Sequence, residues 1–369
     1  MNRIKAASVV LIVLLIAFIA AVQAGKLFGA HEITESMDSS SEKLKYTASF
    51  LDIFDTRTEV MGYAYSEDEF SEQVAILKDR LVFYNNLYDI YNDYDGMNNI
   101  KTINDNAGIA PVEVDPEIIE LLKFSKEMYD LTDGKTNIAM GSVLSIWHEH
   151  REHGINDPES ATLPDMAELQ AAAEHTDISN MIIDEEAGTV YLADPEMSLD
   201  VGSTAKGYAV QRVMEYAKEQ GMDNILLSLG GNIAGIGGRI DGTSFRIAIQ
   251  NPDLTSPDPY IEKVDITDGQ CVVSSGDYQR YYVVDDKVYC HIINPDTLYP
   301  SDTFAAVSVI TDDSGMADAL STALYNMTLE EGMEFVDGMD NVEAMWVYHD
   351  GTKVYSKHFE ESIANSDET

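Results

Sequence analysis

Apolar positions in the first half of the chain recur mainly at helical spacing. The segment 67–91 carries apolar residues three or four positions apart and predicts a long helix. Asp115-Pro116 predicts the start of a second helix, because proline in the first helical turn loses no hydrogen bond. A third helix is predicted over 165–175, after a surface excursion at 157–164. The polar residues 94–104 between the first two helices predict a loop.

The second half of the chain alternates short apolar runs with turns, and the opening stretch 46–60 is also β-rich. Helices are predicted between these runs over 206–219, 316–326 and 329–336. No internal repeat is present, and the mixture predicts an α+β fold. The acidic residues after Phe359 predict a disordered tail. The runs of strand length are 181–184, 189–192, 225–227, 245–250, 271–274, 281–284 and 305–310.

The N-terminus combines a basic start, Met1–Lys5, with an uninterrupted apolar run from Ala6 to Val22. This pattern predicts export. Val22-Gln23-Ala24 suits cleavage of a signal peptide, but the run is also nearly long enough to remain as a membrane anchor. Both alternatives stay open, and both place the body of the protein outside the cytoplasmic membrane. We expect a signal peptide or anchor over 1–24, a linker over 25–45, one domain over 46–358 and an acidic tail over 359–369.

The chain of 369 residues has a formal net charge of −42, which excludes nucleic-acid binding, because phosphate contacts need lysine and arginine. We interpret the charge as a strongly solvated surface, with guidance of a basic partner as the alternative. Against this background the candidate phosphate ligands are Lys206, Arg239, Arg246 and Arg280. The two cysteines, Cys271 and Cys290, can form one disulfide or remain as buried thiols.

The strongest chemical signal lies between Leu199 and Arg239. Asp200 leads into a turn of small residues, and Lys206 begins the helix predicted over 206–219. Backbone N–H groups at a helix start, together with a lysine, form an anion site. The next short strand ends in Leu-Gly-Gly-Asn, where glycines allow a close approach of backbone to ligand. The residues therefore predict a phosphate-bearing ligand, although the glycines match neither a Walker loop nor a Rossmann fingerprint.

These motifs resemble the ApbE-type FAD:protein FMN transferases. The resemblance rests on Asp-x-Gly-x-x-Ala-Lys-Gly-Tyr-Ala-Val from Asp200 and on Leu-Gly-Gly-Asn from Leu229, and the same order of motifs extends over most of the chain after Tyr46. It implies the family's T-fold-related architecture, with mixed or antiparallel sheets flanked by helices. It also implies FAD as the substrate, with the pyrophosphate at the turn between Asp200 and Lys206, and Mg²⁺ as the metal.

Asp318 and Thr322 lie four positions apart on a predicted helix, so their oxygens face the same side. Hard oxygen ligands of this kind suit Mg²⁺. The surrounding sequence resembles the family's metal-binding helix, which implies that both residues bind the metal. By the same resemblance a backbone carbonyl near Ser203 is a third ligand. Ser321 stands where some family members place another carboxylate, which implies a weaker or water-mediated fourth contact.

The segment from Ser274 to Thr297 is the second strong block. His291 follows a predicted strand and is the candidate general base, with ordering of the next turn as the alternative role. The resemblance places the backbone near Ile293 against the flavin. The chain departs from the family pattern at Asn294, where Asp is usual, and at Leu298, where Gly is usual.

Further flavin contacts follow from the resemblance alone. The segment 136–147 is similar to the family's flavin-contacting loop and implies contacts from Ala139, Met140 and Gly141. Phe54 and Tyr94 match positions where the family places ligand-facing aromatics. Without the family, each is an ordinary core or surface aromatic.

Together these expectations describe Mg²⁺-dependent transfer of FMN from FAD to a Thr or Ser hydroxyl of an acceptor protein, with release of AMP. The implied acceptor is a flavin-bearing subunit of a membrane or extracytoplasmic redox system. If water replaces the hydroxyl, the same site is an FAD pyrophosphatase. The alternative from another class is an exported FAD carrier without chemistry.

Overall fold

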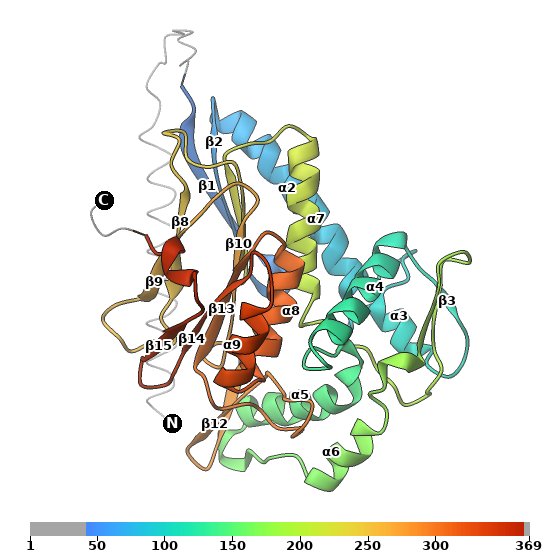
Figure 1. Ribbon diagram of the computed structural model, residues 1–369. Coiled ribbons are helices and arrows are strands. Elements are labelled where there is room, and N and C mark those ends of the chain that lie inside the picture. The colour runs from blue at the N-terminus through green and yellow to red at the C-terminus, as the bar shows by residue number, and fades with distance from the viewer. Residues whose placement is uncertain (1–41, 365–369) are drawn as a thin grey trace, which may run out of the picture. The chain divides into compact units, whose positions relative to one another are not determined.

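The computed structural model describes residues 42–364, which are built on one antiparallel sheet of eight strands (Figure 1). Neighbours in this sheet are often distant in sequence, since β2 pairs with β6 and β7 pairs with β10. In spatial order the strands are β1 (Leu44–Ile53), β2 (Thr56–Ala64), β6 (Ile225–Leu229), β7 (Asn232–Ile236), β10 (Cys271–Gly276), β13 (Ala306–Thr311), β14 (Glu343–Val347) and β15 (Lys353–Tyr355).

Helices cover one face of the sheet: α2 (Glu67–Tyr88), α7 (Ala205–Glu219), α8 (Ser314–Tyr325) and α9 (Leu329–Asp337) (Figure 1). The opposite face is covered by the hairpin of β8 (Phe245–Gln250) and β9 (Tyr260–Ile266) and by the 3-10 helix η4 (Phe359–Ser362). Because both faces are covered, all six residues of β13 are buried. This explains why β13 is mostly apolar, with Ser308 and Thr311 as its buried polar residues, instead of alternating.

Residues 359–364 are part of the fold, which corrects, for the described residues, the disordered tail expected after Phe359. The side chain of Phe359 is fully buried, and Ile363 forms an isolated bridge with Val264 of β9. The acidic composition of this segment gives no sign of the contact. One buried aromatic side chain is nevertheless enough to hold a short segment. Residues 365–369 lie outside the described part.

The remaining elements lie beside the end of the sheet. They include the helices α3 (Ile100–Asp105), α4 (Pro116–Leu131), α5 (Gly141–Asn156) and α6 (Met166–Ala173). A small sheet contains β3 (Val112–Glu113), β5 (Thr189–Leu192) and β4 (Met181–Asp184), and β11 (Tyr281–Val284) pairs with β12 (Lys287–Cys290). Short 3-10 helices lie at η1 (Ile138–Met140), η2 (Pro158–Ser160) and η3 (Ile178–Asn180).

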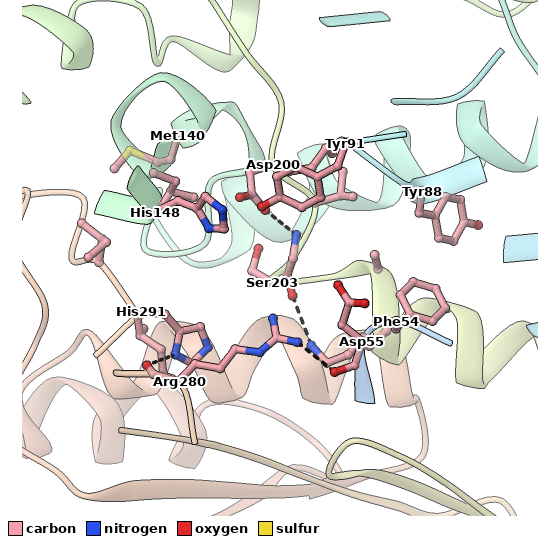
Figure 2. A pocket seen from close by; sticks show the side chains of 18 of the residues that line it. Phe54, Asp55, Tyr88, Tyr91, Met140, His148, Asp200, Ser203, Arg280 and His291 are labelled. Atoms are coloured by element: carbon pink, nitrogen blue, oxygen red, sulfur yellow. Dashed lines mark hydrogen bonds between the residues drawn. The ribbon is translucent and has the colours of Figure 1, made fainter. Parts of the chain in front are cut away.

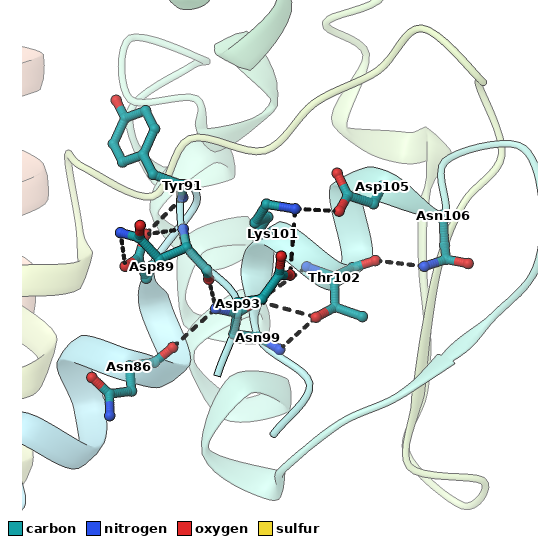
Figure 3. Close-up of polar contacts among 10 residues, drawn as sticks. Asn86, Asp89, Tyr91, Asp93, Asn99, Lys101, Thr102, Asp105 and Asn106 are labelled. Carbon is teal, nitrogen blue, oxygen red and sulfur yellow. Dashed lines mark hydrogen bonds and ion pairs between the residues drawn. The ribbon is translucent and has the colours of Figure 1, made fainter. Parts of the chain in front are cut away.

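The expected loop at 94–104 is wrong in its second half, because α3 begins within it. Asn99 and Thr102 form a capping box, in which each side chain accepts from the backbone N–H of the other residue. Such reciprocal capping satisfies N–H groups that a helix start leaves unpaired. Figure 3 shows this cap within a wider polar network.

The structure also bears on the expected fold class, the cysteines and the N-terminal segments. All strand pairs are antiparallel, which confirms the α+β class with helix-flanked antiparallel sheets. Cys271 and Cys290 are both free and buried, so the disulfide alternative is wrong. The segment 1–24 lies outside the described residues, and β1 begins at Leu44, within the expected linker. Within residues 42–364 no helix has the length and apolar character needed to cross a bilayer.

The closest helix–helix approach joins the first turn of α7 to α8. Thr204 precedes α7 but its side chain makes no capping hydrogen bond. Instead the N–H of Gly207 donates to the Asp318 carboxylate of α8, with 2.8 Å between nitrogen and oxygen. A Cβ atom at position 207 would lie 2.2 Å from the carbonyl oxygen of Ser314. Glycine is therefore required for Asp318 to reach the N-terminus of α7.

We predict that Gly207→Ala lowers the free energy of unfolding by about 1–3 kcal/mol, because the added methyl group forces α7 and α8 apart. Urea unfolding measures the difference. Gly338→Ala is the control, because a Cβ there meets nothing closer than 3.4 Å, and its stability should change by less than about 0.5 kcal/mol. Equal stabilities of Gly207→Ala and wild type would contradict the close contact between the helices.

Candidate active site

The structure contains a cavity of about 420 Å³. It is lined by the β1–β2 turn, the end of α2, helix α5 and the first turn of α7. The segments that flank β11 and β12 complete its lining. In the view of Figure 2, Tyr91 and Asp200 lie on one side of it, Arg280 and His291 lie on the other, and Ser203 lies between. Most of the residues predicted from the sequence line this cavity: Phe54, Tyr94, Met140, Asp200, Ser203, Lys206, Arg280, His291, Ile293 and Thr322.

The β1–β2 turn presents Phe54 to the cavity in an unusual backbone conformation. Phe54 and Asp55 have φ angles of 51° and 49°, a combination that two-residue hairpin turns usually reserve for Asn-Gly. The N–H of Phe54 donates to the Asn85 side chain on α2, with 2.8 Å between the atoms. A strained turn held by a side chain from another element is typical of a functional position.

Asp200 is the acidic residue at the start of the anion-binding turn. Its carboxylate accepts from the N–H of Gly202 at 2.8 Å, which holds the turn before α7. Burial raises the pKa of Asp200, while the Gly202 hydrogen bond and the charges of His148, Lys206 and Arg151 act in the opposite direction. Asp200 therefore shapes the turn where the sequence predicted the pyrophosphate.

Two of the four predicted cations, Lys206 and Arg280, line the cavity. Lys206 contacts the carbonyl of Gly202 at 3.4 Å and Arg280 contacts that of Asp55 at 3.5 Å. Within residues 42–364 neither side chain forms an ion pair, so both charges remain available for a ligand anion.

The other two predicted cations, Arg239 and Arg246, lie outside the cavity. Arg239 pairs with Asp241 at 3.6 Å, and Arg246 pairs with Asp265 at 2.9 Å across the β8–β9 hairpin. Their assignment as phosphate ligands is therefore corrected. Arg239 instead pairs with a nearby carboxylate at the surface, and Arg246 links the two strands of the hairpin.

Sequence reasoning missed two cations of the cavity, Lys135 and Arg151. Lys135 forms an ion pair with Asp296, and Arg151 donates to Nδ1 of His148 at 2.7 Å. No local motif marks either residue, because each reaches the cavity only through the packing of α4 and α5. Tyr91, which packs against His148 with ring centroids 5.5 Å apart, was missed for the same reason.

His291 has its proton position fixed by the backbone. Its Nδ1 lies 3.2 Å from the carbonyl oxygen of Arg280, which can only accept, so Nδ1 carries the hydrogen and Nε2 keeps its lone pair. The pKa of His291 is lowered to about 3, first because the ring is desolvated and then because Arg280, Lys206 and Arg151 repel a proton. The ring is therefore neutral at physiological pH.

Of the residues proposed for a metal, Asp318 contacts the start of α7 but does not line the cavity, whereas Ser203 and Thr322 do. Asp318 is 4% exposed, and within the described residues its carboxylate forms no ion pair. Burial raises its pKa, although Lys206 and the Gly207 hydrogen bond act against this shift. Thr322 lies one turn further along α8 and lines the cavity together with Ser203. A buried, unpaired carboxylate with hydroxyl and carbonyl oxygens nearby fits a hard divalent cation.

Ser321 does not fit that group of ligands. Its hydroxyl donates to the Asp318 carbonyl at 2.9 Å and shares a 2.7 Å hydrogen bond with Ser275, and it does not line the cavity. In residues 42–364 no three His, Cys, Asp or Glu side chains gather as a metal site. A metal at Asp318 therefore needs hydroxyl, carbonyl or substrate oxygens to complete its coordination.

Comparisons with known proteins identify the family of this chain. The model of the ApbE family matches residues 54–346. The chain belongs to the ApbE family. A curated FAD:protein FMN transferase of Klebsiella pneumoniae (strain 342) is 31% identical over 253 residues, which cover 67% of this chain and 74% of that protein. One from Haemophilus influenzae is 27% identical over 276 residues, covering 74% of this chain and 77% of that protein. The chain is therefore classed as a transferase of this family.

Solved structures agree with the ApbE assignment. The ApbE protein of Thermotoga maritima matches with a TM-score of 0.76 and 25% identity, covering 87% of this chain and 100% of that chain. The flavin transferase ApbE of Vibrio cholerae matches with a TM-score of 0.71 at 23% identity, covering 87% of this chain and 99% of that chain, which is a likeness of fold.

Two of the three residues that the ApbE resemblance implied as flavin contacts do not line the cavity. Ala139 is fully buried, and neither it nor Gly141 lines the cavity. A Cβ atom at Gly141 would lie 2.4 Å from the carbonyl oxygen of Ser198. This glycine therefore permits the start of α5 to pack against the Ser198 backbone, and Met140 alone of the three lines the cavity.

The two departures from the ApbE pattern serve the fold. Asn294 donates to the carbonyl of Asn326 at 3.0 Å, a bond that the usual aspartate cannot make. Leu298 has a φ angle of 60°, where glycine is favoured, but its side chain is buried and its carbonyl accepts from the Trp147 indole at 2.9 Å. Packing against α5 offsets the backbone strain.

We predict that His291 makes folding acid-sensitive. An unfolded histidine titrates near pH 6.5 and the folded one near 3, so between these values the unfolded chain binds the extra proton and stability falls as the pH falls. Urea unfolding at pH 7 and pH 5 measures the loss. In His291→Gln the loss should be smaller by about 2 kcal/mol. An identical loss in both proteins would show that His291 is not desolvated in the folded state.

Proposed function

We propose that this protein transfers FMN from FAD to a Thr or Ser hydroxyl of an acceptor protein and releases AMP, with Mg²⁺ as the metal. The observation that carries the proposal is the contact of α7 with α8. Asp318 holds the first turn of α7, while Thr322 and the Ser203 turn line the cavity together with two cations that form no ion pair within residues 42–364. The family and its curated transferases support the choice of flavin chemistry.

The turn before α7 is the proposed site of the FAD pyrophosphate. The positive end of the α7 helix dipole and the ammonium group of Lys206 attract phosphate. Arg280 reaches the cavity from the opposite side and neutralises further charge. Phosphoryl transfer depends mainly on such positioning and charge neutralisation, so these groups suit the reaction.

Asp318, Thr322 and a carbonyl near Ser203 are the residues that would hold Mg²⁺. When bound, Mg²⁺ supplies Lewis-acid stabilisation of the charge that develops on phosphate oxygens. The hydrogen bond from Gly207 keeps the Asp318 carboxylate oriented for this task.

The acceptor hydroxyl needs a group to take its proton. His291 is our candidate because Nδ1 is committed to the Arg280 carbonyl, which leaves the Nε2 lone pair for the hydroxyl. The hydroxyl oxygen then attacks the FMN-side phosphorus, and the bond to the AMP phosphate breaks. If water takes the place of the hydroxyl, the products are FMN and AMP.

We further propose that the protein acts outside the cytoplasmic membrane, on an acceptor that belongs to a membrane or extracytoplasmic redox system. Support comes from the sequence of residues 1–24, with its basic start and apolar run. An exported FAD carrier is the alternative function, but an oriented carboxylate beside the anion site favours chemistry over storage.

We predict that Asp318→Asn lowers AMP release from FAD and Mg²⁺ at least about 100-fold, comparable to the loss of other charge-stabilising groups. Asparagine keeps an oxygen for the Gly207 N–H, so folding is preserved while the charge is lost. Thr322→Val should act similarly, and Thr322→Ser should retain activity. Chromatography measures AMP, and EDTA should stop its release from the wild type. Tight FAD binding with no AMP under any condition would favour the carrier.

We predict that residues 1–45, fused to a reporter that is active only outside the cytoplasmic membrane, produce active reporter. Removal of residues 2–24 should abolish the signal, since it removes the apolar run. Reporter activity in fractionated cells is the measurement. Equal activity with and without the segment would contradict export through this segment.

A further inference from the structure

The end of α2 carries two polar residues that both line the cavity, Asn85 in the last turn and Asp89 at the C-cap. They are four positions apart, so their side chains project from the same side at the helix end. Asn85 Oδ1 accepts the N–H of Phe54 at 2.8 Å. Phe54 adopts a left-handed backbone conformation, which costs conformational free energy. The hydrogen bond to Asn85 offsets part of that free energy.

Asp89 organises the segment that follows the helix. One carboxylate oxygen accepts from the N–H groups of Tyr91 at 2.6 Å and Asn92 at 3.1 Å. The other accepts from the Asn92 side-chain amide at 2.9 Å and from the Tyr94 hydroxyl at 2.8 Å. Figure 3 shows Asp89 and Tyr91 within this network. One carboxylate thus fixes the backbone and a side chain of the segment 90–94.

Apolar packing anchors the start of this segment, at Ile90, and the Tyr91 ring packs on His148, but the residues between Tyr91 and Tyr94 are open to solvent. Tyr91 is 57% exposed, and Asn92 and Asp93 are exposed. Additional support is polar, because the Asn99 side chain donates to the carbonyl of Asn92 at 2.9 Å and to that of Asn86 at 3.2 Å. The position of the aromatic rings at the cavity therefore depends on hydrogen bonds that converge on the end of α2.

We propose that Asn85 and Asp89 are positioning residues that hold the aromatic walls of the FAD site, Phe54 on one side and Tyr91 with Tyr94 on the other. The proposal rests on the proposed function for the identity of the ligand. Neither residue moves a proton or contacts the reacting phosphorus. Each acts by fixing the backbone from which a ring reaches the cavity, which lowers the ordering cost of binding.

The test compares Asp89→Ala with wild type in two measurements. Hydrogen–deuterium exchange of the ligand-free protein should be at least tenfold faster for the amides of Tyr91 and Asn92, about the effect of losing one or two charge-assisted hydrogen bonds. The FAD dissociation constant, from flavin fluorescence, should rise about tenfold. The kcat for AMP release at saturating FAD should change less than threefold. Asn85→Ala should show the same pattern, with faster exchange at Phe54.

Conservative variants separate the contributions of the individual Asp89 hydrogen bonds to FAD affinity. Asp89→Asn keeps an acceptor for the two backbone N–H groups but loses the acceptor for Tyr94, so its FAD affinity should lie between those of wild type and Asp89→Ala. Tyr94→Phe should weaken FAD binding in the wild type and add little in Asp89→Asn. Asp253→Ala is the matched control, because Asp253 accepts from the N–H and hydroxyl of Thr255 in a loop outside the cavity. It should loosen its own loop and leave FAD affinity unchanged.

Unchanged exchange in Asp89→Ala would overturn the ordering role. Faster exchange with unchanged FAD affinity would overturn the contribution to the site, and a loss confined to kcat would assign Asp89 to the chemistry instead. Failure of the proposed function has a different signature, since a folded wild-type protein would then release no AMP, whether or not it binds FAD. The exchange measurement on the ligand-free protein decides the ordering role in that case too.

Discussion

The contact between Gly207 and Asp318 is the constraint on which the rest of the site depends. The start of α7 has unpaired N–H groups and no capping side chain of its own, and the Asp318 carboxylate satisfies one of them from α8. Thr322, one turn further along α8, and the Ser203 turn both line the cavity. A carboxylate at a helix start is favourable in itself, so the hydrogen bond from Gly207 offsets part of the cost of burying the Asp318 charge, although burial still raises its pKa.

Electrostatics act on two scales in this protein. With a net charge of −42, the molecule as a whole repels an anionic nucleotide at long range. Inside the cavity, Lys206 and Arg280 lack ion-pair partners among residues 42–364, whereas Lys135 is neutralised by Asp296. At contact distance, and away from bulk water, two unpaired cations outweigh the screened background charge. Lys206 and Arg280 are thus placed where the proposed phosphate would lie.

The sequence could predict those parts of the site whose residues are close along the chain. Asp318 and Thr322 are one helical turn apart, and Asp200 and Lys206 bracket one turn, so their proximity follows from local geometry. Arg151 and Tyr91 could not be predicted, because α5 and the end of α2 meet only through tertiary packing. Helix α3 was hidden by polar composition and is stabilised by the Asn99 cap. The strand order, in which β2 lies beside β6, has no local signal at all.

The chemistry expected of His291 is coupled to the anion site. Desolvation lowers its pKa most, and Arg280, Lys206 and Arg151 lower it further, so the empty cavity holds a neutral ring with poor basicity. An anionic pyrophosphate next to Lys206 and Arg280 offsets their repulsion, which raises the pKa of the ring. In the proposed reaction, binding of the substrate would therefore improve His291 as a base. The Arg280 carbonyl keeps the proton on Nδ1, so Nε2 is the nitrogen that would accept the proton.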